Sequence, residues 1–378
     1  MAKQKMTVKE QENKEAPIQG DVLEAVLSHV PLIDLVPAAI VSKAWRRAVS
    51  WSLRDPNRVK PWLIVYLQTT MAPYTITTYA YDPQSHVWIE IQGPSVKHVS
   101  DLRSSNSTLL YMLSPCKFAF SLDPLRLTWQ PADAPMVWRT DPIVAMVGHH
   151  LVVAGGACEY EDDPLAVEIY DLKARTWERC DSMPEILKDS AASTWISVAV
   201  VNEAKMYVTE KCSGRTYGFD LNTKTWIGPF DLRPDGTGFC WVIGFAGGRL
   251  ILAGLLGKAE DVKSVKLWEV SGELLEHRKE IGEMPEELIE KFKGNSPCIW
   301  SMGMSAVADF VYLHNPSDPG EVIQCQIVNG VCRWDSVRNA VVNDTTRMQR
   351  IVVSCANVGM GDLRSAMDMG LEIRKMSV

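Results

Sequence analysis

The feature that most constrains the fold is a short pattern that recurs along most of the chain. An aspartate is followed by Leu or Pro, then by four further residues, and then by a tryptophan. Four clear copies end at Trp88, Trp129, Trp177 and Trp226. Two degraded copies follow, one running from Trp268 to about His277 without its second tryptophan and one from Gln326 to Trp334. The spacing is close to 50 residues, which indicates six copies of one supersecondary unit of the size of a propeller blade.

A hydrophobic strand precedes the pattern in most of the units, at residues 109–113, 151–154, 206–209, 250–253 and 310–313. In the third unit this strand ends in Gly155-Gly156, and in the fifth it ends in Gly254-Leu255, half of the same doublet. Glycine tolerates positive φ, so we expect the chain to turn out over the blade at these points. A strand ending in Gly-Gly, a loop, an Asp-containing strand and a tryptophan together resemble the kelch repeat.

The resemblance implies a mainly β fold, a six-bladed kelch β-propeller over residues 60–356. The first blade, with strands at residues 63–68, 75–81 and 87–91, is one strand short. We expect residues 350–355 to pair back with it and close the ring, which removes exposed strand edges. The tryptophans are interpreted as packing residues between adjacent blades, with an aromatic ligand box as the alternative.

Residues 16–56 have helical periodicity, unlike the rest of the chain. Asp21 is a candidate N-cap with Glu24 three residues later, and Leu23, Val26, Leu27 and Val30 share one helical face. A unit of two or three short helices cannot bury enough apolar surface to be stable alone. It needs a partner.

The order of residues in this unit resembles an F-box. The matching segments are Asp21-Val22-Leu23, Val26-Leu27, Val30-Pro31-Leu32, Asp34-Leu35-Val36 and Val41 to Arg46. The usual opening Leu-Pro is Ile18-Gln19 here, and a usual Cys is Ser42. The resemblance implies docking onto the Skp1 adaptor of a cullin-RING ubiquitin ligase. By position, the residues at that contact or in its core would be Leu23, Leu27, Val30, Pro31, Leu35, Val41 and Trp45. The alternative is a helical cap on one end of the propeller.

The two ends of the chain lie outside these domains. Residues 1–15 are rich in Lys, Gln and Glu and have no apolar stretch, so a disordered tail is expected. In residues 357–378, Asp362 can cap a short helix in which Leu363, Ala366, Met367 and Leu371 share a face.

Composition excludes several other classes of protein. The formal net charge of −7 argues against a broad nucleic-acid surface, and no apolar run approaches the length of about 20 residues needed to span a bilayer. The nine cysteines are scattered without close pairs, which is typical of reduced thiols in the cytoplasm or nucleus.

A search for catalytic motifs is negative. The sequence has no GxGxxG after a strand, no P-loop lysine, no HExxH, no CxxC pair and no GxSxG elbow. His149 and His150 form the one adjacent histidine pair, but consecutive strand residues point to opposite faces. We therefore expect no catalytic residue, no metal and no cofactor; a kelch enzyme, which needs convergent side chains at the centre of the ring, is the alternative.

Kelch propellers usually hold a partner on one face, where the loops between blades and the loops from second to third strand emerge. On those loops Glu159, Glu161, Asp162 and Asp163 form an acidic rim, and Tyr160 and Trp138 are residue types enriched at interfaces. Arg139, Arg215 and Arg233 are candidates for acidic groups on a target. A solvated loop is the alternative for each of them.

An F-box followed directly by kelch repeats is a plant-typical arrangement. It implies the substrate-recognition subunit of an SCF (Skp1-cullin-F-box) E3 ubiquitin ligase, a non-catalytic adaptor that presents a protein target for ubiquitination and proteasomal degradation. Several relatives act on enzymes of phenylpropanoid and flavonoid synthesis. The alternative, from another class, is a kelch enzyme or a kelch interaction protein without ligase activity.

Overall fold

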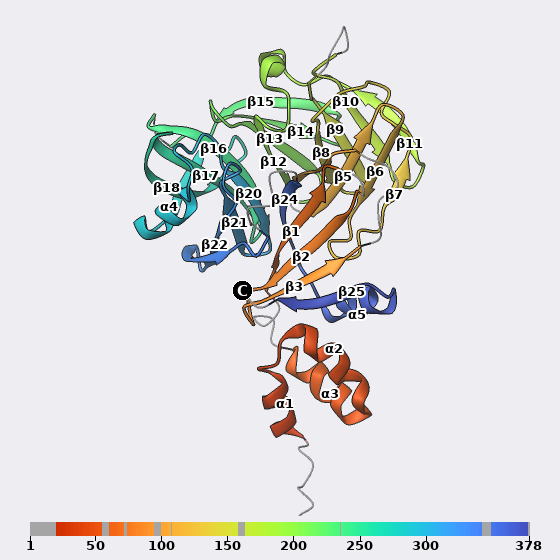
Figure 1. Cartoon of the computed structure of the whole chain (residues 1–378). Helices are drawn as coiled ribbons and strands as arrows, with labels where there is room; N and C mark the ends of the chain where they lie inside the picture. The colour runs from red at the N-terminus through yellow and green to blue at the C-terminus, as the bar shows by residue number, and fades with distance from the viewer. Residues whose placement is uncertain are drawn as a thin grey trace, which may run out of the picture. The chain divides into compact units, whose positions relative to one another are not determined.

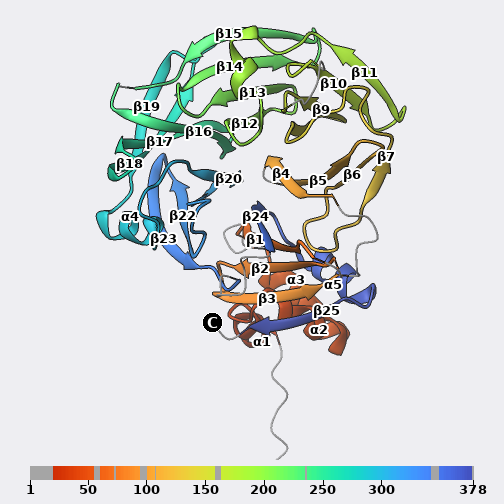
Figure 2. The same cartoon turned by 45° about the horizontal axis from the view of Figure 1, so that its top comes forward.

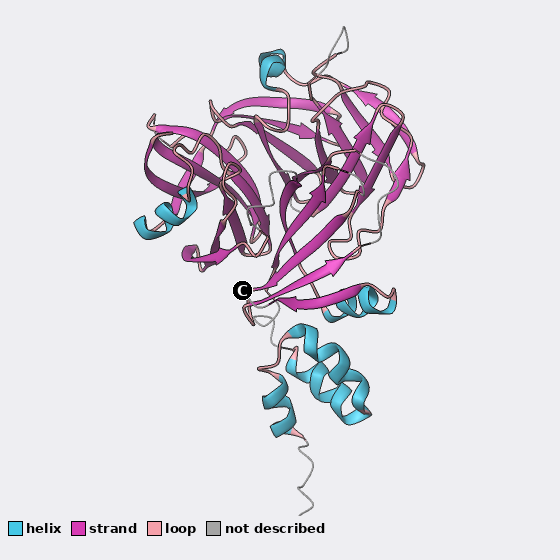
Figure 3. Cartoon of the chain, in the orientation of Figure 1, coloured by secondary structure: helices cyan, strands magenta, loops and turns pink. Residues whose placement is uncertain are grey.

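The computed structural model describes residues 20–54, 60–71, 74–93, 100–106, 108–157, 163–234, 236–341 and 349–376. The chain divides into two compact units, residues 1–59 and 60–378, of which the first is helical and the second is built mainly of strands (Figures 1 and 3). No helix in the described part of the chain is long and apolar enough to cross a membrane. The tail expected at residues 1–15 lies outside the described residues.

The first unit contains α1 (Asp21–Leu27), α2 (Leu32–Val41) and α3 (Lys43–Ser52), with α1 and α2 both packed on α3. Gly20 is the N-cap of α1, with φ of 62°, and Asp21 is the first helical residue, so the predicted Asp21 cap is wrong by one position. Ser42 caps α3, because its Oγ accepts a hydrogen bond from Trp45 N at 3.2 Å. The residue that departs from the usual F-box sequence therefore has a structural role of its own.

The second unit contains six antiparallel sheets arranged around a centre (Figure 2). Blade 1 contains β1 (Trp62–Thr69), β2 (Ile76–Asp82) and β3 (Val87–Gln92), and blade 2 contains β4 (Leu102–Asn106), β5 (Leu109–Ser114), β6 (Lys117–Ser121) and β7 (Gln130–Ala132). Blade 3 contains β8 (Ile143–Val147), β9 (His150–Ala154), β10 (Val167–Asp171) and β11 (Thr176–Cys180), and blade 4 contains β12 (Ile196–Val201), β13 (Lys205–Glu210), β14 (Arg215–Asp220) and β15 (Thr225–Asp231). Blade 5 contains β16 (Gly238–Ala246), β17 (Arg249–Lys258), β18 (Asp261–Ser271) and β19 (His277–Glu283), and blade 6 contains β20 (Gly303–Val307), β21 (Phe310–His314), β22 (Glu321–Val328) and β23 (Val331–Arg338). The 3₁₀ helix η2 (Glu185–Ser190) and α4 (Glu286–Lys293) lie in connections between blades.

The ring is closed by β24 (Gln349–Ala356), which pairs with β1 from Trp62 opposite Ala356 to Thr69 opposite Gln349. Each innermost strand contacts the next around the ring, in the order β24, β4, β8, β12, β16, β20 and back to β24. The predicted six-bladed propeller, closed by the strand at residues 350–355, is confirmed.

The recurring aspartate holds the turn before the outermost strand. Asp171 Oδ1 accepts hydrogen bonds from Lys173 N at 2.7 Å and Ala174 N at 2.9 Å, and Arg175 has φ of 58°. A carboxylate that bonds the backbone two and three residues later stabilises a turn locally, without any contact from elsewhere. Asp123 and Asp220 make both contacts, whereas Asp82 accepts from Gln84 N and from the Ser85 hydroxyl. Positive φ recurs at His86, Leu127 and Lys224.

The recurring tryptophan joins adjacent blades. Trp177, on the outermost strand of blade 3, places its ring 5.7 Å from the Phe118 ring of blade 2, and its Nε1 donates a hydrogen bond to Asp133 O at 3.0 Å. Trp226 repeats the arrangement one blade later, where its Nε1 donates to Asp181 O at 3.2 Å. These two contacts support the interpretation of the repeat tryptophans as packing residues.

The Gly-Gly doublet is required by conformation and by space. Gly155 has φ of 65°, and a Cβ at this position would lie 2.4 Å from Ala191 O in the connection to the next blade. Gly156 has φ of 108°, and its Cβ would lie 2.8 Å from Thr140 O. Gly254 differs: β17 continues through it to Lys258, and a Cβ there would lie 2.5 Å from the Trp241 ring. The expected turn at Gly254 is therefore wrong, and that glycine provides room for an indole instead.

The C-terminal segment contains the expected short helix and an additional strand. The helix α5 (Met360–Asp368) begins after Gly359, whose backbone N donates to Asp362 Oδ2 at 2.9 Å, so Asp362 caps the helix from inside its first turn. The strand β25 (Glu372–Met376) then pairs with β3 and makes blade 1 five-stranded. This strand was not predicted, because its five residues show no clear apolar alternation.

Candidate functional site

The residues predicted to contact an adaptor fall into two groups. Leu23, Leu27 and Leu35 are at most 3% exposed, in the apolar core that also contains Ile33, Val36 and Val49. Val30, Pro31 and Trp45 are half-buried, and Val41 is exposed. Of the two positions that the resemblance allowed, Leu23, Leu27 and Leu35 therefore occupy the core, where they stabilise the helices from inside.

Other apolar residues of the helical unit are exposed to solvent. We call them the helical apolar surface, and they are Val22 and Val26 on α1, Ile40 and Val41 at the end of α2, and Trp51 on α3. Val22 and Val26 are four residues apart, so they share a helical face. The Arg54 guanidinium lies 5.5 Å from the centre of the Trp51 ring. Exposed apolar side chains in so small a unit are typical of a surface that a partner covers.

The predicted target-binding residue Arg139 is not on the surface. Its side chain and that of Glu168 are fully buried, and Arg139 Nη2 forms an ion pair with Glu168 Oε2. Arg139 Nη1 also donates to Ala166 O, and Nε donates to Val137 O at 3.3 Å. Assigning Arg139 to target binding is therefore wrong, because a guanidinium in this environment stabilises the loop before β8 from within.

Glu168 completes that arrangement from the other side. Its Oε1 accepts a hydrogen bond from Met136 N at 2.7 Å and its Oε2 accepts one from Val137 N at 3.3 Å. The buried carboxylate on β10 thus determines the path of the loop that carries Met136 and Trp138.

The remaining predicted residues have mixed positions. Trp138 is half-buried and Arg215 is exposed. Arg233 is exposed but forms a two-point contact with Asp231, with Nε–Oδ1 at 2.9 Å and Nη2–Oδ2 at 2.7 Å. Asp163 accepts from Arg179 Nη2 at 3.0 Å, so it is already paired. Glu159, Tyr160, Glu161 and Asp162 lie outside the described residues.

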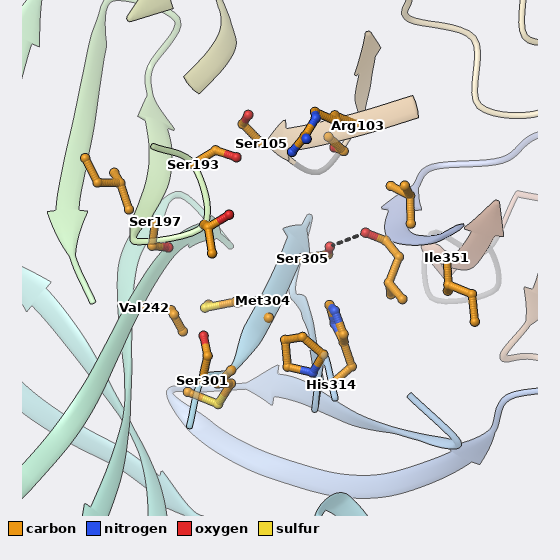
Figure 4. Close-up of a pocket in the computed structure, with 18 of the residues that line it drawn as sticks. Arg103, Ser105, Ser193, Ser197, Val242, Ser301, Met304, Ser305, His314 and Ile351 are labelled. Atoms are coloured by element: carbon orange, nitrogen blue, oxygen red, sulfur yellow. Dashed lines mark hydrogen bonds between the residues drawn. The ribbon is translucent and has the colours of Figure 1, made fainter. Parts of the chain in front are cut away.

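A cavity of about 390 Å³ lies where the innermost strands begin and the second strands of two blades end. We call it the channel cavity (Figure 4). The innermost strands of five blades line it, together with Lys211 at the end of β13 and His314 at the end of β21. Arg103 of β4 and His314 lie on opposite sides of it. Loops between blades and from second to third strand emerge at this end, so the cavity lies on the face expected to hold a partner.

Asp141, in the loop before β8, anchors one side of the channel cavity. It accepts hydrogen bonds from Ser193 Oγ at 2.6 Å and Thr194 N at 3.1 Å, and forms an ion pair with Arg103 Nη1. Asp101 Oδ2 lies 3.4 Å from Arg103 Nη2 and 2.7 Å from Arg350 Nη2. These contacts hold residues of blades 1, 2 and 4 in a defined arrangement around the cavity.

Three serines that line the channel cavity join neighbouring blades. Ser105 Oγ accepts from Val144 N at 3.1 Å, Ser197 Oγ accepts from Ile243 N at 2.9 Å, and Ser305 Oγ donates to Val353 O at 3.3 Å. They come from blades 2, 4 and 6, and each bonds the innermost strand of the next blade. Their hydroxyls are therefore used for closing the ring.

Two basic groups in the channel cavity have weakened affinity for protons. Burial lowers the pKa of Lys211, although its Nζ donates to Thr194 O at 2.9 Å. Burial, together with the nearby charge of Lys211, lowers the pKa of His314 to about 4. His314 Nδ1 is buried and has no hydrogen-bond partner among the described residues. Sequence reasoning missed these residues, because no local motif connects Arg103, Lys211, His314 and Arg350.

The structure contains no arrangement of three or more His, Cys, Asp or Glu residues that could hold a metal ion within the described part of the chain. His149 lies in the turn between β8 and β9, and the adjacent His150 is the first residue of β9, with its Nε2 3.7 Å from Asp171 Oδ2.

The F-box domain family matches residues 21–56, which include α1, α2 and α3. Together with the closed six-bladed ring, this match defines an F-box protein with a kelch-type propeller. The chain is 46% identical over 371 aligned positions to the F-box/kelch-repeat protein At1g23390 of Arabidopsis thaliana, and the alignment covers 93% of each chain. The chain belongs to the F-box/kelch-repeat proteins.

Two solved structures are similar at low sequence identity. One is a chain from the crystal structure of a nidogen/laminin complex, with 10% identity, a TM-score of 0.44, and coverage of 78% of this chain and 98% of that chain. The other is the structure of YjhT, with 13% identity, a TM-score of 0.43, and coverage of 64% and 85%.

Proposed function

We propose that the chain is the substrate-recognition subunit of an SCF E3 ubiquitin ligase. The helical unit binds a Skp1-like adaptor, and through it a cullin, while the propeller binds a protein target. The observation that carries this proposal is the match of an F-box to residues 21–56, in a unit whose exposed apolar side chains include Val22, Val26, Ile40, Val41 and Trp51.

In this role the chain carries out no bond chemistry. Binding the adaptor and the target at once raises the effective concentration of target lysines near the charged E2. The ligase pathway operates in the cytoplasm and nucleus, and the composition of the chain is compatible with either. An enzyme of phenylpropanoid or flavonoid synthesis is the proposed target class, which proteomics of cells with and without the chain would test.

The adaptor proposal is tested by co-purifying the full chain with Skp1. Two double variants, Val22→Glu with Val26→Glu and Ile40→Glu with Val41→Glu, place charges on the helical apolar surface without altering the core. Burying an apolar side chain is worth about 1.5–3 kcal/mol, so losing two is expected to weaken binding by roughly 100-fold or more. Leu27→Asp would be a poor test, because Leu27 is buried and its replacement would unfold the helices.

The matched control is Ile186→Glu with Val331→Glu, which changes two exposed apolar residues of the propeller. This control should bind the adaptor as the parent does. Failure of the parent to bind Skp1 would remove the ligase function and favour a kelch interaction protein or a kelch enzyme. Unchanged binding by both helical variants would show that the adaptor contact lies elsewhere.

A further inference from the structure

The channel cavity has the charge of an anion site in a chain that is acidic overall. Arg103, Lys211 and Arg350 are among its lining residues, whereas no aspartate or glutamate of the described chain lines it. The whole chain has a formal net charge of −7. A cavity lined by charged side chains of one sign concentrates the electrostatic potential, so the channel cavity attracts negatively charged groups.

Arg103, Lys211 and Arg350 have more N–H donors than the contacts described above use. A guanidinium has five N–H donors and an ammonium has three. Arg350 contacts Asp101, which is 55% exposed, and Lys211 donates one hydrogen bond to the Thr194 carbonyl. The carboxylates of Asp101 and Asp141 offset two of the three positive charges. One positive charge therefore remains without a carboxylate partner among the described contacts of the cavity.

Lys211 and His314 are the titratable groups of the cavity that a bound anion would affect most. Burial removes water from the Lys211 ammonium and lowers its pKa, an effect that the nearby charges, that of Asp141 among them, offset only in part. His314, whose Nδ1 is buried without a hydrogen-bond partner among the described residues, lines the same cavity. A carboxylate bound in the cavity would favour the protonated forms of both groups.

Two exposed tryptophans are sequence neighbours of residues that line the cavity. Trp195 directly follows Thr194 and Trp300 directly precedes Ser301, and both neighbours line the cavity. The indoles are 52% and 67% exposed. Tryptophan is strongly enriched among residues that dominate binding energy at protein interfaces. A free small anion would use only the cavity, whereas a polypeptide segment would use the cavity and the indoles together.

We propose that the channel cavity recognises an acidic segment of the target protein. The carboxylate of a glutamate or aspartate enters at Arg103, Lys211 and Arg350, and an apolar residue beside it packs on Trp195 or Trp300. This inference rests on the proposed function, in which the propeller holds a target, and it specifies the chemistry of the segment.

The test is a selection with the full chain immobilised and two displayed libraries of random linear peptides. One library has a fixed central glutamate and the other has glutamine at the same position. The glutamate library should be enriched strongly over the glutamine library, with aromatic or aliphatic residues next to the fixed position. Peptides selected in this way should bind in solution with measurable affinity.

The diagnostic variants are Lys211→Met and Arg350→Gln. Lys211→Met removes a buried charge, and Arg350→Gln leaves behind an exposed aspartate, so neither creates a buried unpaired charge. Arg103 is unsuitable, because its loss would leave Asp141, which is 13% exposed, without its ion pair. Each variant should weaken the selected peptides by about tenfold or more. Lys173→Met and Arg364→Gln make the same charge changes on an exposed turn and on α5, and should have no effect.

Three results would overturn the inference. The first is equal enrichment of both libraries, and the second is unchanged peptide binding by Lys211→Met and Arg350→Gln. The third is calorimetric binding of succinate or phosphate to the parent chain with no peptide selected, which would identify a small-anion site. None of these measurements uses the adaptor, so their failure leaves the Skp1 result standing, and loss of Skp1 binding leaves the peptide result standing.

Discussion

A buried ion pair lies beneath the loop between blades 2 and 3. Arg139 and Glu168 are both fully buried, and between them they bond backbone groups that include Met136 N, Val137 N, Val137 O and Ala166 O. Breaking a buried pair by removing one member leaves an uncompensated charge in a medium that solvates it poorly. The arginine is therefore a determinant of loop geometry, even though its type and loop position suggested recognition.

Arg139→Met is expected to lower the free energy of unfolding by about 3–5 kcal/mol, because Glu168 is left buried and unpaired. Adding Glu168→Gln should recover part of the loss, since glutamine is neutral and can still accept from Met136 N. Urea unfolding measures both. A double variant less stable than Arg139→Met would contradict this account.

Arg179→Met is the matched control, since Arg179 and Asp163 form an ion pair at 3.0 Å in which the side chains are 53% and 33% exposed. Its cost should stay below about 1 kcal/mol, as for other solvent-exposed pairs.

At the scale of the element, a few recurring residues determine the geometry of the blades. The aspartate stabilises the turn, the tryptophan packs on the preceding blade, and in blade 3 the Gly-Gly doublet lets the second strand turn away next to the following blade. Gly155 and Gly247 allow the cost of a positive φ to be measured apart from the cost of a steric clash. Their φ values are 65° and 58°, but a Cβ would meet close neighbours only at Gly155.

Gly247→Ala is expected to cost about 1–2 kcal/mol, the penalty of a left-handed conformation for a residue with a Cβ. Gly155→Ala should cost clearly more, because its Cβ would also lie 2.4 Å from Ala191 O and the connection between blades 3 and 4 must shift. Thermal unfolding of the two variants checks the difference, and equal losses would show that crowding at Gly155 is relieved without cost.

At the scale of the whole propeller, stability depends on joining the two ends of the ring in blade 1. The strand β24 pairs with β1 over its full length, and Tyr312 of blade 6 donates to Pro61 O at 2.7 Å across the same junction. On the other side of blade 1, β25 covers the edge of β3. Closure and edge protection thus come from one C-terminal segment.

Truncation after Arg338 should abolish cooperative unfolding, because blade 1 then lacks its innermost strand and β1 becomes an exposed edge. Truncation after Ala356 keeps the ring closed, so the propeller should still unfold cooperatively, at a lower temperature. That loss is expected because Leu363 and Ala366, fully buried in the intact chain, disappear together with the strand that covers β3. Calorimetry of the two truncated chains distinguishes these roles; cooperative unfolding of the shorter chain would show that closure is dispensable.

Much of the architecture could be predicted from the sequence, because the features that define it act locally or repeat. An aspartate that bonds the backbone two residues later needs no distant partner, and a tryptophan at a period near 50 residues indicates the blade whatever surrounds it. The ring, its closure by residues 350–355 and the separate helical unit all follow from such patterns. The candidate binding residues did not follow, because exposure depends on which distant segment covers a side chain. Arg139 is buried by Glu168, 29 residues away, and Leu23 and Leu27 are buried while Val22 and Val26 remain exposed.

The sequence by itself therefore determined the period, the turns, the helices and the family of this protein, since these rest on interactions within a few residues or on repetition. Only the tertiary structure brought Arg103, Lys211, His314 and Arg350 to one cavity, from four blades and nearly 250 residues of chain. A ring places the same end of each innermost strand near its centre. The residues that meet there have no characteristic spacing in the sequence, so the sequence alone does not reveal them.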